Sequence, residues 1–364
     1  MGQLVILPTP PGTSLEGQTC LITGANSGIG FETARQMLTL KASPVIITAR
    51  DKYKGQAAVA ALRQDPEILA ANPSARVEMF HLDLDDYQSG LALCDLVKRE
   101  VSELDVLLCN GGMNIMHYQR SKSGHEQMMQ VNCYTHFLII LELLPLLRAT
   151  AAKRKSSSRV TFVGSVTQYH HTLSRTPLGP TENVLSYYDD KEIYQGLLRY
   201  SDSKFVVNAF IRRLGRVVSD SEVIVNNFCP GLVESTGLDR AIPRWLKLIM
   251  YIYRRTSSRP LKHAGWTAIH ATAVAGRESH GKFIQSNKID PGPPLLNESA
   301  GNEFVERLWK DFVADVASLD PMLKLFAHWK AAMSYHHCFP CNLRSIVLFN
   351  DLPLGTLLVA CTGP

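Results

Sequence analysis

A tyrosine and a lysine four residues apart form the pattern in this sequence best suited to acid–base chemistry. On a helix, Tyr200 and Lys204 would present their side chains on one face. A phenol with a pKa of about 10 exchanges protons poorly at neutral pH, and a nearby ammonium favours its phenolate form. The spacing therefore predicts a proton-transfer pair with Tyr200 as the acid or base.

A second pair, Tyr187 and Lys191, has the same spacing. Asp189 and Asp190 lie between these two residues, where they would neutralise the lysine and oppose a phenolate. The residues that follow Tyr200 are mostly small, and an apolar helix continues beyond them. We therefore favour Tyr200.

Two polar residues could complete the site. Ser165 ends an apolar run that we expect to be a strand, where its hydroxyl could bond to a substrate carbonyl. The Asn132 amide could hold a water that links Lys204 to solvent. Taken singly, each residue is better interpreted as an ordinary strand-end hydroxyl or a polar helix residue.

A glycine-rich turn lies between the first strand-like run and a helical stretch. Glycines let a backbone turn tightly and approach a pyrophosphate, whose charge then lies at the helix N-terminus. This context favours dinucleotide binding over an unoccupied structural turn. The residues predicted to bind the cofactor here are Gly24, Ser27, Gly28, Ile29 and Gly30.

The end of the second strand-like run bears on the choice of cofactor. An acidic residue there would bond to the adenosine ribose, whereas a basic one can pair with a 2′-phosphate. Ala49 is followed by Arg50, with Lys54 a few residues on. These residues favour NADP(H) over NAD(H), although a surface Arg and Lys are also common solvated charges.

Short apolar runs alternate with amphipathic stretches from about residue 18 to 290, which is typical of successive βα units. The expected strands are 19–23, 44–49, 76–84, 105–110, 159–164, 223–228 and 282–285. The expected helices are 30–40, 56–63, 88–101, 126–147, 203–217 and 302–316. The predicted fold class is α/β, a doubly wound sheet of about seven parallel strands flanked by helices.

In combination these motifs resemble the classical short-chain dehydrogenase/reductase family over about residues 15 to 320. Along the chain they are the glycine turn, Asp83-Leu84, Asn110-Gly111-Gly112, Asn132, Ser165, Tyr200 to Lys204 and Pro230-Gly231. The resemblance implies a Rossmann fold, and residues 49–51 and 83–84 are similar to retinol-dehydrogenase-like and fungal secondary-metabolism members. Three features depart from the family: Cys109 replaces an Asn, Gly111 replaces an Ala, and the distance from Ser165 to Tyr200 is longer than usual.

The resemblance also implies roles that spacing alone does not assign. Asp83 would contact the adenine, and Asn110 would line the cofactor site. Val233 and Ser235 would lie near the nicotinamide carboxamide, and Lys204 would also bond to the nicotinamide ribose.

The resemblance gives a plan of the chain. An N-terminal arm (1–17) precedes the catalytic domain (18–322), and a C-terminal extension (323–364) follows it. Within the domain, the polar segment 166–196 is interpreted as a surface insertion, and 237–262 as a substrate lid. The lid is rich in apolar residues, which implies a hydrophobic substrate. Its alternative is a helix in a subunit interface or at a membrane surface.

Composition limits the other classes of protein. The 364 residues carry a net charge of +5 without the basic, aromatic-interleaved patches typical of nucleic-acid binding. Eight scattered cysteines fit a reducing, cytoplasmic location, and no stable membrane insertion is expected. His336, His337, Cys338 and Cys341 lack a second Cys pair, so no metal site is expected.

The expected function is an NADP(H)-dependent oxidoreductase that interconverts a ketone and a secondary alcohol on a hydrophobic small molecule, such as a secondary-metabolite intermediate. One alternative is a non-catalytic NADP(H)-binding regulator. Another is a docking subunit of a biosynthetic complex. The family resemblance implies a homodimer or homotetramer, with a monomer as the alternative.

Overall fold

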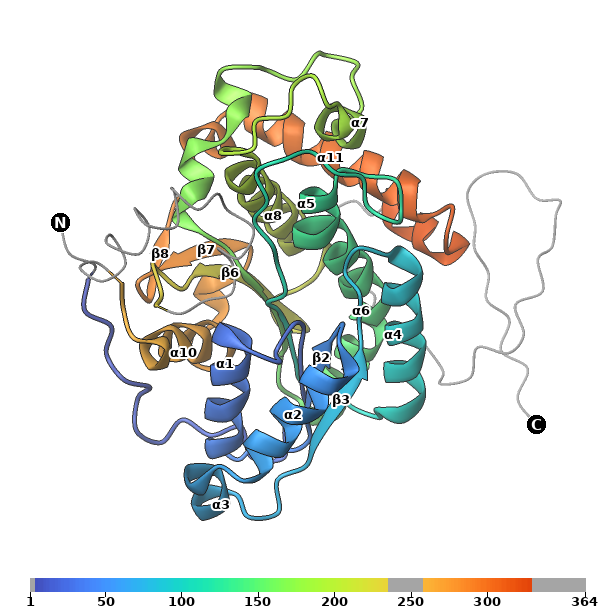
Figure 1. Cartoon of the computed structure of the whole chain (residues 1–364). Helices are drawn as coiled ribbons and strands as arrows, with labels where there is room; N and C mark the ends of the chain where they lie inside the picture. The colour runs from blue at the N-terminus through green and yellow to red at the C-terminus, as the bar shows by residue number, and fades with distance from the viewer. Residues whose placement is uncertain (1–3, 235–257, 329–364) are drawn as a thin grey trace, which may run out of the picture. The chain divides into compact units, whose positions relative to one another are not determined.

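The computed structural model describes residues 4–234 and 258–328. Their centre is an eight-stranded sheet of order β3-β2-β1-β4-β5-β6-β7-β8, drawn as arrows in Figure 1. The strands β1 to β7 are parallel, and β8 runs antiparallel to β7. The strands are β1 (Cys20–Ile22), β2 (Val45–Ala49), β3 (Val77–His81), β4 (Val106–Cys109), β5 (Ser158–Val163), β6 (Val223–Cys229), β7 (Lys282–Gln285) and β8 (Lys288–Asp290).

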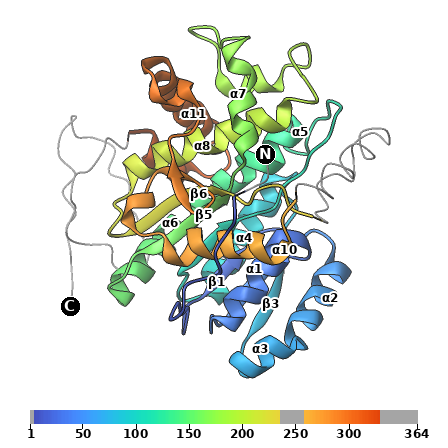
Figure 2. The ribbon, with the colours of Figure 1, turned by 90° about the vertical axis from the view of Figure 1, so that its left-hand side faces the viewer.

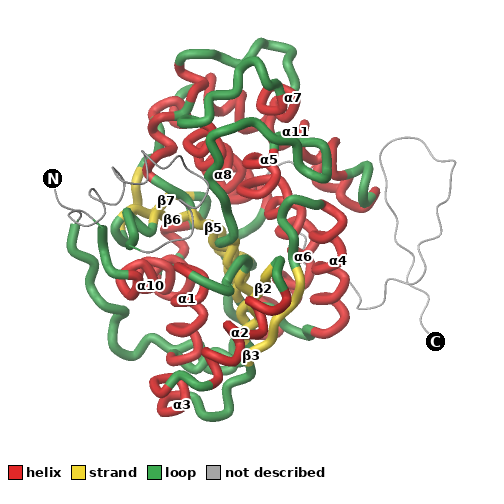
Figure 3. The backbone as a smooth tube through the Cα atoms, viewed as in Figure 1, coloured by secondary structure: helices red, strands yellow, loops and turns green. Residues whose placement is uncertain are grey.

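Helices cover both faces of this sheet, as the colouring by secondary structure in Figure 3 shows. The α-helices are α1 (Gly28–Thr39), α2 (Lys52–Arg63), α3 (Pro66–Ala71), α4 (Tyr87–Glu100), α5 (Gln127–Met129), α6 (Thr135–Arg154), α7 (Val184–Asp189), α8 (Arg199–Val217), α10 (Leu261–Ile269) and α11 (Ser299–Val316). A π-helix, η1 (Gln130–Tyr134), joins α5 to α6.

Two hydrophobic clusters lie on opposite faces of the sheet, because successive side chains of a strand point to opposite sides. Leu21 and Leu107 belong to the cluster that also contains residues of α4, α6, α8 and α11. Ile22 and Leu108 belong to the other cluster, with residues of α1 and α10. Figure 2 shows α1 and α10 next to each other on that second face. Strands buried on both faces explain the continuous apolar runs of the sequence.

The predicted doubly wound α/β fold is confirmed. All seven predicted strands and all six predicted helices are present, with ends displaced by a few residues. The structure adds β8 and the helices α3, α7 and α10. Helix α8 begins at Arg199, which is four residues before the predicted start and brings Tyr200 into the helix.

The segment 166–196 differs from the expected surface insertion. It forms two 3-10 turns, η2 (Val166–His170) and η3 (Thr172–Ser174), followed by α7. Val184, Leu185 and Tyr188 are buried in the cluster below α11, and the Val184 N–H donates to the Asp311 carboxylate at 2.8 Å. Figure 1 shows α7 beside α11. The segment is therefore an integral part of the folded domain, because its aromatic and aliphatic side chains pack inward.

The helical run from Gln127 to Arg154 is long and apolar enough to cross a membrane by length and composition alone. Most of its apolar window, 72%, is buried inside the protein, as expected of a core helix that is hydrophobic on all sides.

The chain divides into two units, residues 1–332 and 333–364. The second unit, most of the expected C-terminal extension and lid residues 237–257 lie outside the described residues.

Candidate active site

The predicted catalytic residues come from three elements that meet at the carboxyl edge of the sheet. Ser165 follows β5 and begins η2, and Tyr200 and Lys204 lie in the first two turns of α8. Asn132 lies in the π-helix η1. In an open α/β sheet this edge is where ligands bind.

Lys204 is held between the end of β5 and Tyr200. Its Nζ donates to the Val163 carbonyl at 2.8 Å and lies 5.4 Å from the centre of the Tyr200 ring. Burial lowers the pKa of Lys204 to about 8, because the charged form is poorly solvated there. At pH 7 the group is still mostly an ammonium, which favours the phenolate form of a neighbouring tyrosine.

Ser165 is arranged to act as a hydrogen-bond donor. Its Oγ accepts from the Thr167 N–H at 3.2 Å and from the Thr167 hydroxyl at 3.0 Å. With these two bonds accepted, the remaining group of Ser165 is its own O–H. A half-buried hydroxyl of this kind can stabilise charge on a substrate oxygen.

Asn132 is fully buried and links the segment after β4 to α8. Its Oδ1 accepts from the Met113 N–H at 2.8 Å, and its Nδ2 donates to the Met113 carbonyl and the Ser203 hydroxyl, each at 3.0 Å. Both amide hydrogens are thus used by the protein. The amide therefore holds the segment after β4 and α8 together. For the predicted water, only a lone pair of Oδ1 remains. π-Helical turns often mark functional sites.

The alternative pair does not share a helix face. The Tyr187 hydroxyl donates to the Thr176 carbonyl at 2.7 Å, and α7 ends at Asp189, before Lys191. This geometry supports the choice of Tyr200.

The glycine turn has the shape of a phosphate cradle. Gly24 and Gly28 both have φ of +61°, which L side chains rarely adopt. A Cβ on Gly30 would lie 2.9 Å from the Ala25 Cα, so glycine is also required where α1 begins. Within the described chain, the exposed Ser27 side chain does not cap α1, which leaves backbone N–H groups of the first turn, including that of Ile29, for an anion.

Asn110 joins β4 to this turn. Its Nδ2 donates to the carbonyls of Thr23 and Gly24 at 2.9 and 3.1 Å, and its N–H donates to the Thr23 hydroxyl at 2.8 Å. Asn110 therefore lines the cradle and also supports it. Thr23 was not among the predicted site residues, although its place between a strand and the first glycine could have indicated this role.

Two acidic residues that follow β2 and β3 already bond to other groups of the protein. Burial opposes ionisation of Asp83, but hydrogen bonds from Lys122 and the Asp85 N–H, with the charge of Arg50, lower its pKa overall. Its Oδ2 accepts from the Lys122 ammonium at 2.7 Å. Asp51 caps α2 by accepting from the Lys54 N–H at 3.1 Å.

The remaining predicted cofactor residues differ in how they are placed. Arg50 is exposed at the end of β2, and the Lys54 Nζ lies 3.8 Å from the Asp51 carboxylate. Val233 is buried and pairs with Arg259 in a parallel bridge. Ser235 lies outside the described residues.

The parallel sheet, the glycine cradle and the Tyr–Lys pair define an α/β oxidoreductase of the dinucleotide-binding class. A family model described as short chain dehydrogenase matches residues 18–176. Short chain dehydrogenase sor7 of Hypocrea jecorina (strain QM6a) is 51% identical over 292 residues, covering 80% of this chain and 81% of that protein. Short chain dehydrogenase macD of Penicillium terrestre is 36% identical over 315 residues, covering 86% and 94%. The chain belongs to the short-chain dehydrogenase/reductase family.

Solved structures share the fold. The Pseudomonas aeruginosa RhlG/NADP active-site complex has a TM-score of 0.57 at 24% identity, covering 76% of this chain and 97% of that one. A 7α-hydroxysteroid dehydrogenase complexed with NADH and 7-oxo glycochenodeoxycholic acid has a TM-score of 0.56 at 16% identity, covering 77% and 96%. At these identities the likeness concerns the fold alone.

Proposed function

We propose that this protein is an NADP(H)-dependent enzyme that interconverts a ketone and a secondary alcohol on a hydrophobic small molecule. The observation that carries the proposal is the buried Lys204 ammonium between the Val163 carbonyl and the Tyr200 ring, at the sheet edge that also holds Ser165. Burying a lysine is costly to the fold, and a lysine with a pKa perturbed in this way often marks a functional site.

The proton chemistry follows from these three side chains. When bound, the nicotinamide supplies or accepts a hydride at the carbonyl carbon. In reduction, Tyr200 donates its phenolic proton to the developing alkoxide, and the Ser165 hydroxyl donates a hydrogen bond to the same oxygen. Lys204 stabilises the resulting phenolate until a proton returns to Tyr200. In oxidation the same groups act in reverse.

The glycine turn would hold the diphosphate of the cofactor, through the N-terminus of α1. The preference for NADP(H) rests on Arg50, which is exposed at the end of β2. Asp51, the neighbouring acid, already caps α2 and lies close to the Lys54 ammonium. A carboxylate so engaged is a poor acceptor for ribose hydroxyls, whereas Arg50 can pair with a 2′-phosphate.

The apolar composition of 237–262 supports a hydrophobic substrate, and the fungal relatives suit an intermediate of secondary metabolism. We further propose a cytoplasmic homodimer or homotetramer. Cys20, Cys94, Cys109, Cys133 and Cys229 are free, buried thiols, which fits a reducing compartment.

The test measures NADPH and NADH binding by fluorescence, and NADPH oxidation with 2-decanone, 1-tetralone and trans-1-decalone. We expect tighter binding of NADPH than of NADH, and turnover of at least one ketone. Arg50→Glu should remove the preference for NADPH, whereas Arg99→Glu, the same change of charge at an exposed residue in the last turn of α4, should keep it. Cofactor binding without turnover would favour a regulator instead.

A further inference from the structure

The residue before the proton-transfer tyrosine is a buried arginine that the proposed chemistry does not use. Arg199 is the first residue of α8, and its side chain is 1% exposed. Its Nε lies 3.9 Å from the Glu126 carboxylate, and its Nη1 lies 3.9 Å from the Asp202 carboxylate. A guanidinium is expensive to bury, so a folded domain retains one where it serves a purpose.

The segment 166–196 encloses this guanidinium. The Arg199 Cζ lies 5.1 Å from the centre of the Tyr188 ring and 5.2 Å from that of Tyr194, both within cation–π range. The Thr172 N–H, from the same segment, donates to the Asp202 carboxylate at 2.7 Å. The segment thus supplies two rings and a hydrogen bond around one buried charge.

Glu126 connects Arg199 to the second helix of the site. Its carboxylate accepts from the N–H groups of Met128 and Met129 at 3.0 and 2.9 Å, which caps α5. Helix α5 continues directly into the π-helix that carries Asn132. The Arg199–Glu126 pair therefore joins the starts of the two helices that hold Tyr200 and Asn132.

A second link between these helices lies one turn further along. The Asn132 Nδ2 donates to the Ser203 hydroxyl at 3.0 Å, and that hydroxyl donates to the Tyr200 carbonyl at 2.7 Å. The two links therefore hold the first two turns of α8 against the segment that carries Asn132, in addition to the packing of α8 in the core.

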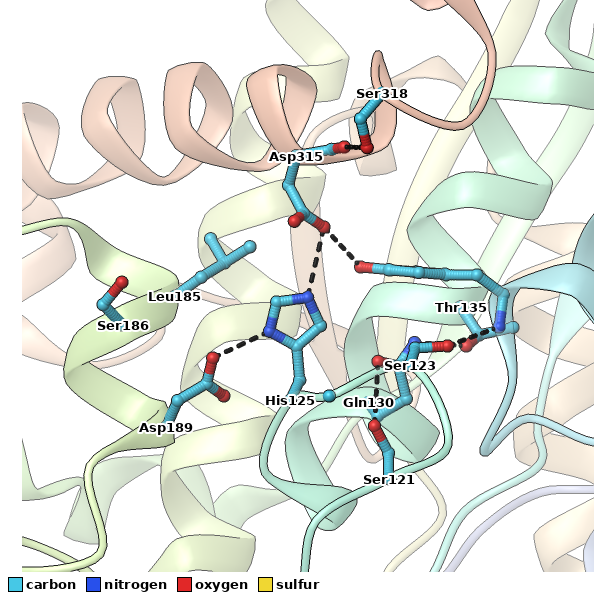
Figure 4. A network of polar contacts seen from close by, with 12 residues as sticks. Ser121, Ser123, His125, Gln130, Thr135, Leu185, Ser186, Asp189, Asp315 and Ser318 are labelled. Atoms are coloured by element: carbon cyan, nitrogen blue, oxygen red, sulfur yellow. Dashed lines mark hydrogen bonds and ion pairs between the residues drawn. The ribbon is translucent and has the colours of Figure 1, made fainter.

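The residues beside Glu126 hold the segment 166–196 in place, as Figure 4 shows. The His125 imidazole lies between two carboxylates, 2.8 Å from Asp189 of α7 and 3.2 Å from Asp315 of α11. The Asp189 carboxylate also accepts from the Glu126 N–H at 2.7 Å. Helices α7 and α11 are thereby tied to the same short segment that caps α5.

We propose that Arg199 is a positioning residue for Tyr200, and that the segment 166–196 is the clamp that encloses it. Arg199 sets the start of α8 against Glu126, and Tyr188 and Tyr194 hold the guanidinium in that position. This role rests on the proposed function of Tyr200. It also explains why the chain between Ser165 and Tyr200 is long and folds inward.

The test compares Arg199→Met, which removes the charge at similar length, with Arg199→Lys, which keeps it. Turnover is measured with NADPH and the ketone that the wild-type chain reduces fastest among the three named above. Arg199→Met should lower kcat by roughly 10- to 100-fold, the cost of displacing a catalytic group by about 1 Å. NADPH affinity should stay within about twofold, and Arg199→Lys should recover at least about half of the lost rate on a logarithmic scale, because an ammonium keeps the positive charge and can still contact the two rings.

Arg213→Met is the matched control. Arg213 lies on the same helix, donates to Glu306 at 2.8 Å and has its Cζ 5.3 Å from the Trp309 ring. The control should keep kcat within about twofold, because it leaves the start of α8 intact. If Arg199→Met does not fold, Tyr194→Leu replaces it, since this variant retains every charge and removes one ring.

The outcomes separate this inference from the proposed function. Wild-type kcat in Arg199→Met or in Tyr194→Leu, with Tyr200→Phe inactive, overturns the role of Arg199 alone. An equal loss in Arg213→Met and Arg199→Met also overturns it, because the effect would then be general to α8. Full activity of Tyr200→Phe, or no turnover by the wild-type chain, overturns the proposed function first.

Discussion

Lys204 should destabilise the fold that it serves, so Lys204→Met should give a more stable but inactive protein. Burial lowers the lysine pKa to about 8, which corresponds to a loss of stability of about 3 kcal/mol at pH 7. Methionine forfeits the hydrogen bond to the Val163 carbonyl, which costs about 1 kcal/mol. The expected net gain in the free energy of unfolding is about 2 kcal/mol.

The gain must depend on pH in a defined direction. Below pH 8 the lysine is protonated in both the folded and unfolded chains, so the whole penalty is present. Between about pH 8 and 10.5 the unfolded chain binds the proton more tightly than the folded one. The wild-type chain therefore becomes relatively more stable as pH rises, and the advantage of Lys204→Met shrinks through this window.

Urea unfolding followed by tryptophan fluorescence at pH 7 and pH 10 measures this difference. Lys98→Met is the opposed control. Lys98 pairs with the buried Glu142 carboxylate. Lys98→Met removes this partner and leaves a buried charge unpaired, so the variant should be less stable than the wild type. A Lys204→Met variant less stable than the wild type at pH 7, or a gain that does not change with pH, would refute the reasoning.

Two further predictions concern the cradle and the clamp. Gly30→Ala should weaken NADPH binding by at least about tenfold, because its Cβ would press on Asn110. Gly179→Ala, where a Cβ has ordinary clearance, should bind NADPH normally. Calorimetry measures both affinities, and equal values would argue against the cradle. Burial opposes protonation of His125, but its two carboxylate partners outweigh this and raise its pKa to about 9. The stabilisation by the charged His125 imidazole is fully present below pH 6.5 and is lost as pH rises through about 9. Thermal melts should therefore show His125→Gln less stable than the wild type at pH 6 and nearly as stable at pH 10. A difference in melting temperature that stays constant across that range would exclude a charged His125 between the two carboxylates.

The strands could be predicted from the sequence because a parallel strand buried on both faces is a continuous apolar run. Strand β8 was not predicted because it has no continuous apolar run. It is only three residues long, and Lys288 and Ile289 are exposed. Helix α10 was missed because it begins inside the apolar segment that we assigned to the lid, at Leu261.

The candidate site also contains some residues that could be predicted from the sequence and others that could not. The glycine turn and the Tyr200–Lys204 pair depend on residues close in sequence, so their spacing and their neighbouring residues predict them. The charges of His125, Glu126 and Arg199 meet only in the folded chain, and charged residues in an isolated sequence are best interpreted as solvated. The segment 166–196 was expected to be a surface insertion because it is polar, but Tyr188 and Tyr194 pack around the Arg199 charge, which comes from another part of the chain.

The central claim is that Tyr200 transfers the proton in a hydride transfer linked to NADP(H). The most direct measurement is steady-state NADPH oxidation by Tyr200→Phe, with NADPH affinity measured on the same protein. We predict a fall in kcat of at least about a hundredfold, with affinity for NADPH within about twofold of the wild type. Turnover at the wild-type rate would contradict the claim and remove Tyr200 from the chemistry.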